Sequence, residues 1–385
     1  MSKCRRLMSP FLKLSLSFAI VLILACSGFF LPRNSSLPPL SALNAKDEIL
    51  KEALFYQKLQ GNAVQCLLCP RRCVIADGKR GFCGVRENKK GALYTLVYGK
   101  PVTVTLHDPV EKKPLFHFLP SSLTCSVATA GCNLRCRFCQ NWEISQAKPE
   151  ELRYEYLLPG DLVARAAGAG RGIIAYTYSE PTIFYEYMLE TAKLARAAGI
   201  KNCMHSNGFI NPEPLRALCR YLDAANIDLK GFSEDYYAQL TEGSLDPVLE
   251  SLKILRQEGV HLEITTLLLP GLNDDDIALM NMCRWIKENL GDEVPLHFSR
   301  FFPTYRLTHL EPTPSETLEK ARHIALACGL KYVYIGNMPG GLAENTYCPS
   351  CGKAVLKRTG YTISEVNLDG GKCIFCGEEI TGVWN

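Results

Sequence analysis

The chain has 385 residues, of which 47% are hydrophobic and 21% are charged. This apolar fraction excludes wholesale disorder, and the length predicts two or three domains. The net charge of +4, from 43 basic and 39 acidic residues, is too balanced to indicate a nucleic-acid partner, so we predict none. The 18 cysteines are the unusual feature of the composition, and their spacing decides their use.

An uncharged apolar stretch occupies residues 14–30 and comes after a cluster of basic residues that includes Arg5 and Arg6. Its length lies between that of a signal-peptide core and that of a membrane-spanning helix. We therefore interpret residues 1–40 as a signal or anchor segment with its linker. The basic cluster favours export of the rest of the chain, whereas the many thiols favour a reducing compartment. We expect a membrane-associated protein whose main part faces the cytoplasm, or a cytoplasmic protein if this segment is absent.

Residues 41–120 are expected to form a small cysteine-rich module. We predict a helix over 46–60 and strands over 92–96 and 101–106, where apolar or β-branched residues alternate. The module contains four closely spaced thiols: Cys66, Cys69, Cys73 and Cys83. This set fits a structural zinc ion, which we favour, or an iron–sulfur cluster, and the absence of any metal is the third alternative.

Short apolar runs alternate with amphipathic segments between residues 121 and 340. We expect strands at 123–129, 172–178, 200–205, 225–229, 261–268, 294–298 and 331–335. We expect helices at 161–169, 182–198, 213–222, 247–258, 274–289 and 315–328. This alternation predicts an α/β domain with a parallel sheet and helices packed on it. Periodicity alone fits both a doubly wound sheet and an open or partial barrel.

The loop after the first of these strands contains three cysteines, Cys132, Cys136 and Cys139. Folds of this class place their functional loops at the carboxyl ends of the strands. A structural zinc ion or an electron-transfer cluster takes four protein ligands. Three thiolates on a four-iron cluster leave one iron open for a substrate. A zinc ion completed by a distant ligand is the alternative, and a disulfide would leave one cysteine over.

The spacing C-x3-C-x-F-C, with the aromatic Phe138 before the last cysteine, resembles the signature of radical S-adenosylmethionine (SAM) enzymes. Residues 130–146 are similar to the AmmeMemoRadiSam system radical SAM enzymes, relatives of the pyruvate formate-lyase activating enzymes. The resemblance runs from about residue 54 to residue 384. It implies a partial (β/α)6 barrel, a [4Fe-4S] cluster on the three cysteines, and SAM on the open iron. It also implies one-electron cleavage of SAM, followed by abstraction of a hydrogen atom from a substrate.

The resemblance implies SAM contacts at the ends of the later strands. The expected contacts are Glu180, Ser206, Asn207, Asp228, Lys230 and His297. The family's Gly-Gly-Glu turn lacks its two glycines here, so its backbone contacts are not carried over. Structural alternatives are a helix cap for Glu180 and a turn for residues 205–208. Instead of contacting SAM, Asp228 and Lys230 could form an ion pair with each other. His297 could instead be a buried histidine of the core.

Residues 341–385 are expected to form a zinc-ribbon-like tail with a strand at 361–366. Its two Cys-x2-Cys-Gly pairs place four thiols at the ends of two turns: Cys348, Cys351, Cys373 and Cys376. The nearby basic residues are few, so we expect a structural role for the zinc. Other cysteines fall in apolar segments and are expected to be small buried hydrophobic residues: Cys125, Cys203, Cys219, Cys283 and Cys328.

The sequence thus predicts a radical SAM enzyme that needs an electron donor. Its substrate is not specified by any motif, although the relation to activating enzymes suggests a partner protein. A non-catalytic, metal-stapled scaffold that binds a protein or nucleic acid is one alternative. A cysteine-dependent redox enzyme is another. The three-cysteine loop argues against both, because a scaffold needs no open iron and a redox pair would leave Cys132 unused.

Overall fold

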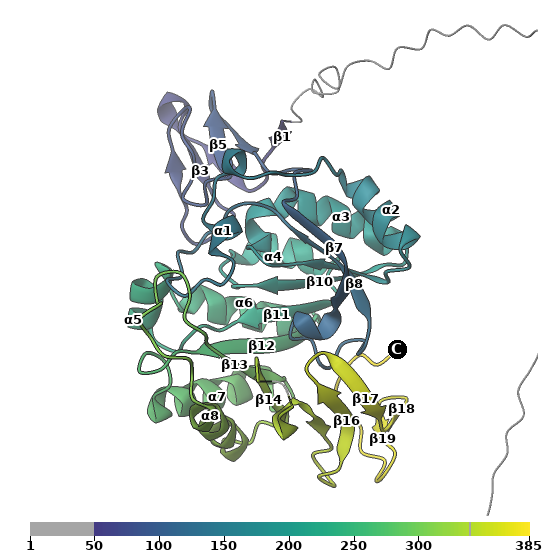
Figure 1. Cartoon of the computed structure of the whole chain (residues 1–385). Helices are drawn as coiled ribbons and strands as arrows, with labels where there is room; N and C mark the ends of the chain where they lie inside the picture. The colour runs from purple at the N-terminus through teal and green to yellow at the C-terminus, as the bar shows by residue number, and fades with distance from the viewer. Residues whose placement is uncertain (1–49, 339) are drawn as a thin grey trace, which may run out of the picture. The chain divides into compact units, whose positions relative to one another are not determined.

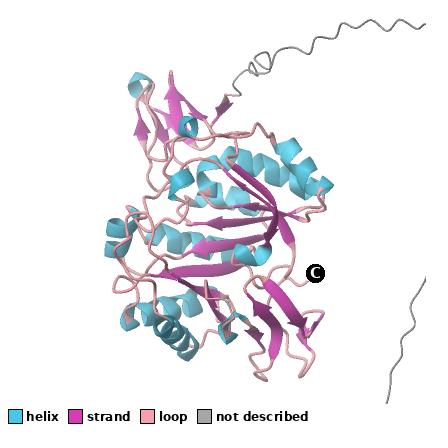
Figure 2. Ribbon diagram, viewed as in Figure 1, coloured by secondary structure: helices cyan, strands magenta, loops and turns pink. Residues whose placement is uncertain are grey.

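The computed structural model describes residues 50–338 and 340–385 (Figures 1 and 2). The predicted signal or anchor segment, residues 1–40, lies outside these residues. No helix in the described ranges is long and apolar enough to cross a membrane.

One sheet of eight strands, in the order β14-β13-β12-β11-β10-β9-β8-β7, forms the centre of the described chain. Strands β8 to β14 are parallel, and β7 is antiparallel to β8 at one edge. The strands are β7 (Thr103–Pro109), β8 (Leu123–Ala128), β9 (Ile173–Tyr176), β10 (Lys201–Ser206), β11 (Ala224–Asp228), β12 (His261–Leu268), β13 (Leu296–Arg300) and β14 (Val333–Gly336). A doubly wound sheet would reverse its strand order, so the sequential order excludes that alternative.

The helices between the strands line the sheet in the same order (Figure 1). They are α2 (Pro159–Gly168), α3 (Tyr185–Ala197), α4 (Pro212–Cys219), α6 (Asp246–Gln257), α7 (Asp276–Leu290) and α8 (Ser315–Ala327). Right-handed crossovers between successive neighbouring strands place all of these helices on one face of the sheet. The α/β prediction is confirmed, and each predicted strand and helix of this region is found within a few residues.

Strand β9 shows why these runs become parallel strands. All four of its residues are buried, as is typical of a strand covered on both faces. The helices bury one apolar side each, and α6, for example, buries Val248, Leu252 and Leu255. Cys125 and Cys203 lie fully buried within β8 and β10, as predicted for thiols that serve as small hydrophobic residues.

The expected helix over 46–60 is wrong in its described part. Strands β1 (Lys51–Glu52) and β2 (Tyr56–Lys58) lie there instead, and each pairs with a later antiparallel strand. Between them, Phe55 has a φ of 55°, which is incompatible with a right-handed helix. Strand pairing therefore outweighs the local helical pattern of this segment.

The predicted cysteine-rich module contains two small sheets, with the orders β1-β6-β5 and β2-β3-β4. Their remaining strands are β3 (Val64–Cys66), β4 (Val74–Ile75), β5 (Arg86–Lys89) and β6 (Ala92–Thr95). Strand β7 belongs by sequence to the predicted 41–120 module, but it pairs with β8 in the main sheet.

The tail contains β15 (Thr346–Tyr347), β16 (Ala354–Thr359), β17 (Thr362–Val366), β18 (Leu368–Asp369) and β19 (Lys372–Cys373). Buried Arg358 anchors it, because its guanidinium donates to the carbonyl of Phe116 and to Thr346 Oγ1, both at 2.7 Å. Thr346 Oγ1 is in turn 2.9 Å from the hydroxyl of Tyr334 on β14. Polar contacts therefore join the tail to the central sheet.

This chain of hydrogen bonds continues to His117. Burial lowers the pKa of His117 to about 3, so its ring is neutral at physiological pH. Its Nδ1 lies 2.6 Å from the carbonyl oxygen of Thr381, which can only accept, so Nδ1 carries the proton. Nε2 is therefore the acceptor for the Tyr334 hydroxyl at 2.5 Å.

We expect Tyr334→Phe to lower the free energy of unfolding by about 1–3 kcal/mol, because it leaves His117 Nε2 and Thr346 buried without their shared partner. Chemical denaturation of the full chain measures this change. Tyr361→Phe is the matched control, since Tyr361 is 49% exposed and should change the free energy by less than about 0.5 kcal/mol. Equal effects of the two variants would contradict a structural role for the buried chain of hydrogen bonds.

Candidate functional site

The three-cysteine loop begins directly after β8 and ends at the short helix α1 (Trp142–Ser145). Gly131 opens it with a φ of 96°, and a Cβ atom there would lie 2.8 Å from the carbonyl oxygen of Cys83. The loop therefore requires glycine at this position, because the cysteine-rich module packs directly against it. The backbone N–H of Gly131 donates to the carbonyl of Ile144 at 2.9 Å and closes the loop on itself.

Polar groups surround the sulfur atoms of this loop. Cys132 Sγ accepts from the backbone N–H of Leu134 at 3.4 Å and from Asn207 Nδ2 at 3.8 Å. Cys139 Sγ lies 3.1 Å from Ser145 Oγ. Donors of this kind stabilise thiolates, which are the form that binds metal.

Burial acts in the opposite direction and disfavours the charged form of the thiols. It raises the pKa of Cys132 well above its usual value, and the negative charge of Glu180 and the neighbouring Cys136 and Cys139 add to the effect. It raises the pKa of Cys136 to about 12, although the ammonium group of Lys230 partly opposes the shift. A metal bound by these thiols would therefore have to displace their protons.

The spacing of the three sulfur atoms does not suit a single metal ion. Around one zinc ion, sulfurs at about 2.3 Å from the metal lie about 3.8 Å from one another. Within the described residues, the tail cysteines are the group of ligand atoms that all lie within 4.8 Å of one another, and the loop thiols do not meet this limit. The wider spacing fits a cluster in which each thiolate binds a different iron.

Glu180 connects the ends of β9 and β10. Its Oε1 accepts from the backbone N–H of Thr182 at 2.9 Å and from Ser206 Oγ at 2.7 Å. Its Oε2 accepts from the backbone N–H of Asn207 at 2.9 Å. Burial raises the pKa of Glu180, and these hydrogen bonds oppose the shift. The contact with Thr182 is the predicted helix cap, at the start of η5 (Pro181–Phe184).

Asn207 extends this arrangement to the cysteine loop. Its amide nitrogen lies 2.9 Å from Asn133 Oδ1 as well as 3.8 Å from Cys132 Sγ. Glu180, Ser206, Asn207 and Cys132 therefore form one connected group at the ends of three neighbouring strands.

Asp228 and Lys230 lie at the end of β11. Asp228 Oδ2 is 2.9 Å from Lys230 Nζ, and its Oδ1 is 2.9 Å from His205 Nε2. Burial alone would raise the pKa of Asp228, but Lys230 and His205 together hold it well below its usual range. The ammonium of Lys230 also lies 5.8 Å from the ring centre of Phe138 in the cysteine loop. The predicted ion pair is present, and it borders the loop.

The structure does not bring His297 to this group. The residue lies near the beginning of β13, and its Nε2 is 2.7 Å from Glu263 Oε2. Glu263 also accepts from His261 and from the backbone N–H groups of Phe116 and His117. His297 is therefore placed as a buried core histidine, which is the alternative to a SAM contact that the sequence left open for this residue.

Sequence analysis missed three residues of the site: Asn133, Ser145 and His205. Their contacts depend on how the loops fold back, as in the 3.1 Å contact between Cys139 and Ser145. His205 carried the clearest signal, because it directly precedes the predicted Ser206 and Asn207 at the end of a strand.

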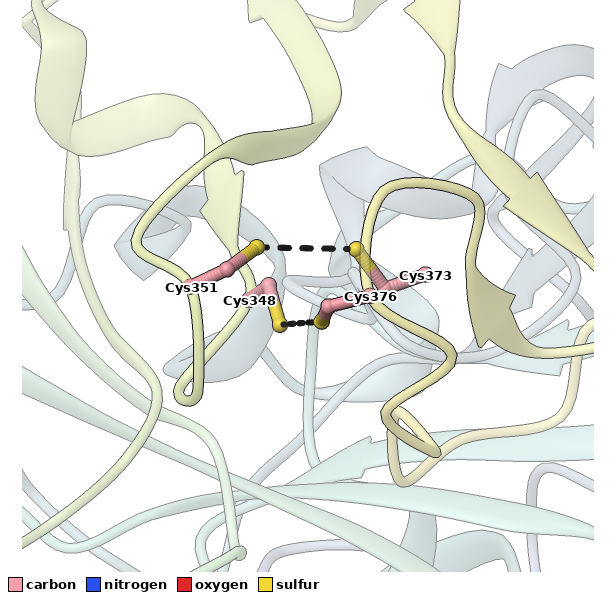
Figure 3. A group of neighbouring side chains, drawn as sticks. All are labelled: Cys348, Cys351, Cys373 and Cys376. Carbon is pink, nitrogen blue, oxygen red and sulfur yellow. Dashed lines mark hydrogen bonds between the residues drawn. The ribbon is translucent and has the colours of Figure 1, made fainter.

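The four tail cysteines form a second, closed group (Figure 3). Cys348 Sγ is 3.5 Å from Cys376 Sγ, and Cys351 Sγ is 3.8 Å from Cys373 Sγ. Although burial works against it, the backbone N–H groups of Phe375 and Cys376 help to lower the pKa of Cys373 to about 7. These distances and donors fit one tetrahedral metal ion.

Comparison with known proteins adds to this geometry. A family model of the radical SAM superfamily matches residues 126–283. An uncharacterised protein of Methanocaldococcus jannaschii is 47% identical over 333 residues, which cover 86% of this chain and 99% of that protein. The pyruvate formate-lyase 1-activating enzyme of Escherichia coli is 24% identical over 220 residues, 53% of this chain and 89% of that enzyme. The GTP 3′,8-cyclase of Chlorobaculum tepidum is 28% identical over 154 residues, 39% of this chain and 46% of that enzyme.

The matched segment contains the three-cysteine loop together with Glu180, Asn207 and Asp228. The comparisons therefore favour an enzyme over the alternative of a non-catalytic scaffold. On the family match, the relatives and the three thiols at the end of β8, this chain is an enzyme that belongs to the radical SAM superfamily.

Proposed function

We propose that this enzyme holds a [4Fe-4S] cluster on Cys132, Cys136 and Cys139, cleaves SAM reductively and removes a hydrogen atom from its substrate. The observation that carries the proposal is the set of three thiols, too widely spaced for one ion and bordered by polar residues from the next three strands. When bound, the cluster supplies the electron for SAM cleavage and one iron that no cysteine occupies. The strand order supports the partial barrel that the family resemblance implies.

The ends of β9 and β10 are proposed to hold one part of SAM. Ser206 donates its hydroxyl proton to Glu180, so its oxygen is proposed to accept from the amino group of SAM, and the amide of Asn207 is proposed to border the amino or carboxylate group. Glu180 already accepts three hydrogen bonds, so its main proposed role is to fix these two residues. The Asn207 contact with Cys132 keeps this part of the site next to the cluster ligands.

Asp228 and Lys230 are proposed to bind the rest of SAM. The low pKa of Asp228 keeps it a carboxylate at neutral pH, so it can accept from the ribose hydroxyls. Lys230 stays protonated beside it, because Asp228 raises the pKa of the ammonium well above its usual value, against the effect of burial. The existing contact between Asp228 and His205 orients the carboxylate before SAM arrives.

We propose a protein substrate, as the relation to the Escherichia coli activating enzyme suggests. The exposed surface next to the cysteine loop suits such a partner. Trp142, which is 40% exposed, stacks on Tyr305 at 5.3 Å and offers an aromatic face. A separate protein must donate the electron. We also propose that the enzyme works in a reducing compartment, since the sixteen cysteines of the described ranges are all free thiols.

We expect the anaerobically reconstituted protein, once reduced, to convert SAM to 5′-deoxyadenosine and methionine, measured by chromatography. Cys132→Ala should reduce this to the background rate, because the cluster loses one of its three ligands. Cys283→Ala is the control for loss of a thiol outside the loop, since Cys283 is a buried cysteine of α7, and it should retain activity. Normal SAM cleavage by Cys132→Ala would contradict the assignment of the cluster to these three cysteines.

Asp228→Asn and Lys230→Met should each weaken SAM binding by about 5- to 100-fold, since each removes a hydrogen bond that involves a charged group. Titration of SAM into the reconstituted enzyme measures the dissociation constant. Lys320→Met is the control, because the ion pair of Lys320 with Asp276 is exposed and lies on α8 and α7. Unchanged affinity in both site variants would leave Asp228 and Lys230 as a purely structural ion pair.

We propose zinc as the metal of the tail, with a structural role. Cys373→Ser should lose one zinc per chain and about 3 kcal/mol or more of stability, because metal binding contributes folding free energy. Metal analysis and denaturation measure both, and Cys203→Ser is the control for a buried thiol outside the group. If a folded Cys373→Ser variant cleaved less SAM per bound iron than the unchanged enzyme, a purely structural role for the tail zinc would be contradicted.

A further inference from the structure

We propose that the cysteine-rich module holds a second iron–sulfur cluster, a [4Fe-4S] cluster on Cys66, Cys69, Cys73 and Cys83. The site is separate from the three-cysteine loop, and the proposal does not require SAM cleavage. It replaces the zinc ion that the sequence pattern favoured.

The first observation is that separate turns bring the four thiols to one cavity. Cys66 ends β3, Cys69 and Cys73 lie in the turn before β4, and Cys83 lies in the turn before β5. All four line one cavity of about 20 Å³, which exceeds the 10–15 Å³ or so that a water molecule needs. The four thiols therefore share one enclosed space that could admit a bound group.

The second observation is that hydrogen-bond donors face the sulfurs. The backbone N–H of Phe82 donates to Cys73 Sγ at 3.5 Å, and Arg86 Nη1 donates to Cys66 Sγ at 3.7 Å. Arg86 is 2% exposed and lines the cavity, and within the described chain its Nε has no hydrogen-bond partner. A buried, unpaired donor at the cavity wall is costly, and sulfide or thiolate sulfur of a cluster would accept from it.

The third observation distinguishes a cluster from zinc. No three of these thiols lie within 4.8 Å of one another in the described residues, whereas the tail cysteines all do. One zinc ion holds its sulfurs about 3.8 Å apart, as in the tail. A four-iron cluster holds each thiolate on its own iron, so its sulfurs lie roughly 6 Å apart. Both groups have four cysteines, and only their spacing in the fold separates them.

The cavity also shares a wall with the three-cysteine loop. Asn133, the next residue after Cys132, lines it, and Arg71 Nε donates to the Asn133 carbonyl at 2.5 Å. Arg135 donates to the carbonyl of Phe82 at 2.5 Å, and the guanidinium groups of Arg71 and Arg135 lie 3.4 and 4.2 Å from the centre of the Phe82 ring. Four cysteine ligands leave no iron open, so the second cluster suits electron transfer. From this position it can pass one electron from an external donor to the first cluster.

The triple variant Cys132→Ala/Cys136→Ala/Cys139→Ala tests the proposal, because it removes the first cluster and leaves the second site intact. After anaerobic reconstitution with iron and sulfide, we expect about four irons and four sulfides per chain, and the Mössbauer spectrum of a [4Fe-4S] cluster. Because the tail is proposed to keep one zinc ion, a folded triple variant that holds two zinc ions and no iron, or no metal beyond that of the tail, would overturn the proposal. Circular dichroism establishes that the variant is folded.

A second variant covers the case in which the triple variant does not fold. Cys69→Ser in the otherwise unchanged chain should lower the iron content from about eight to about four per chain. Cys219→Ser, which changes a buried thiol of α4, should leave it at eight. A wild-type content of about four irons, unchanged by Cys69→Ser, would overturn the proposal. SAM cleavage by that same protein would show that the proposed function stands without the second cluster.

Discussion

The site depends on one constraint, the unbroken sequential order of parallel strands from β8 to β14. Because neighbouring parallel strands end at the same edge, loops that are distant in the sequence are adjacent in space. Cys132, Glu180, Asn207 and Asp228 lie at the ends of four successive strands, and hydrogen bonds link the first three directly. A reversal of the strand order anywhere in this stretch would separate the thiols from the residues proposed to hold SAM.

The same constraint explains why so many charged and polar groups are buried at one edge. Each has partners before any ligand binds: Glu180 accepts three hydrogen bonds, and Asp228 lies between Lys230 and His205. Buried polar groups without partners would cost several kcal/mol. Paired in advance, they hold their orientation, and a ligand meets a rigid arrangement instead of ordering one. The thiols are the exception, since burial raises the pKa of Cys132 and Cys136 and disfavours their charged form.

The sequence was sufficient to predict the features that periodicity and local spacing control. The strands and helices after residue 121 arise from buried apolar runs, and the three cysteines share one loop. It was insufficient where partners come from distant segments. Residues 51–58 form strands because later strands pair with them, and His297 is held by Glu263 on the neighbouring strand. Likewise, the contact of His205 with Asp228 joins two strand ends 23 residues apart.

The cysteine groups show the limit of spacing arguments most clearly. The tail and the cysteine-rich module both contain a Cys-x2-Cys pair, so the sequence favours zinc for both. In the tail, two such pairs on separate turns face each other, and Cys348 and Cys376 lie 3.5 Å apart. In the module, the other two thiols come from single positions on different turns, and the side chains of Phe82 and Arg86 line the cavity with them. The different metals proposed for the two groups therefore rest on the packing around the sulfurs, which the spacing of the cysteines in the sequence does not specify.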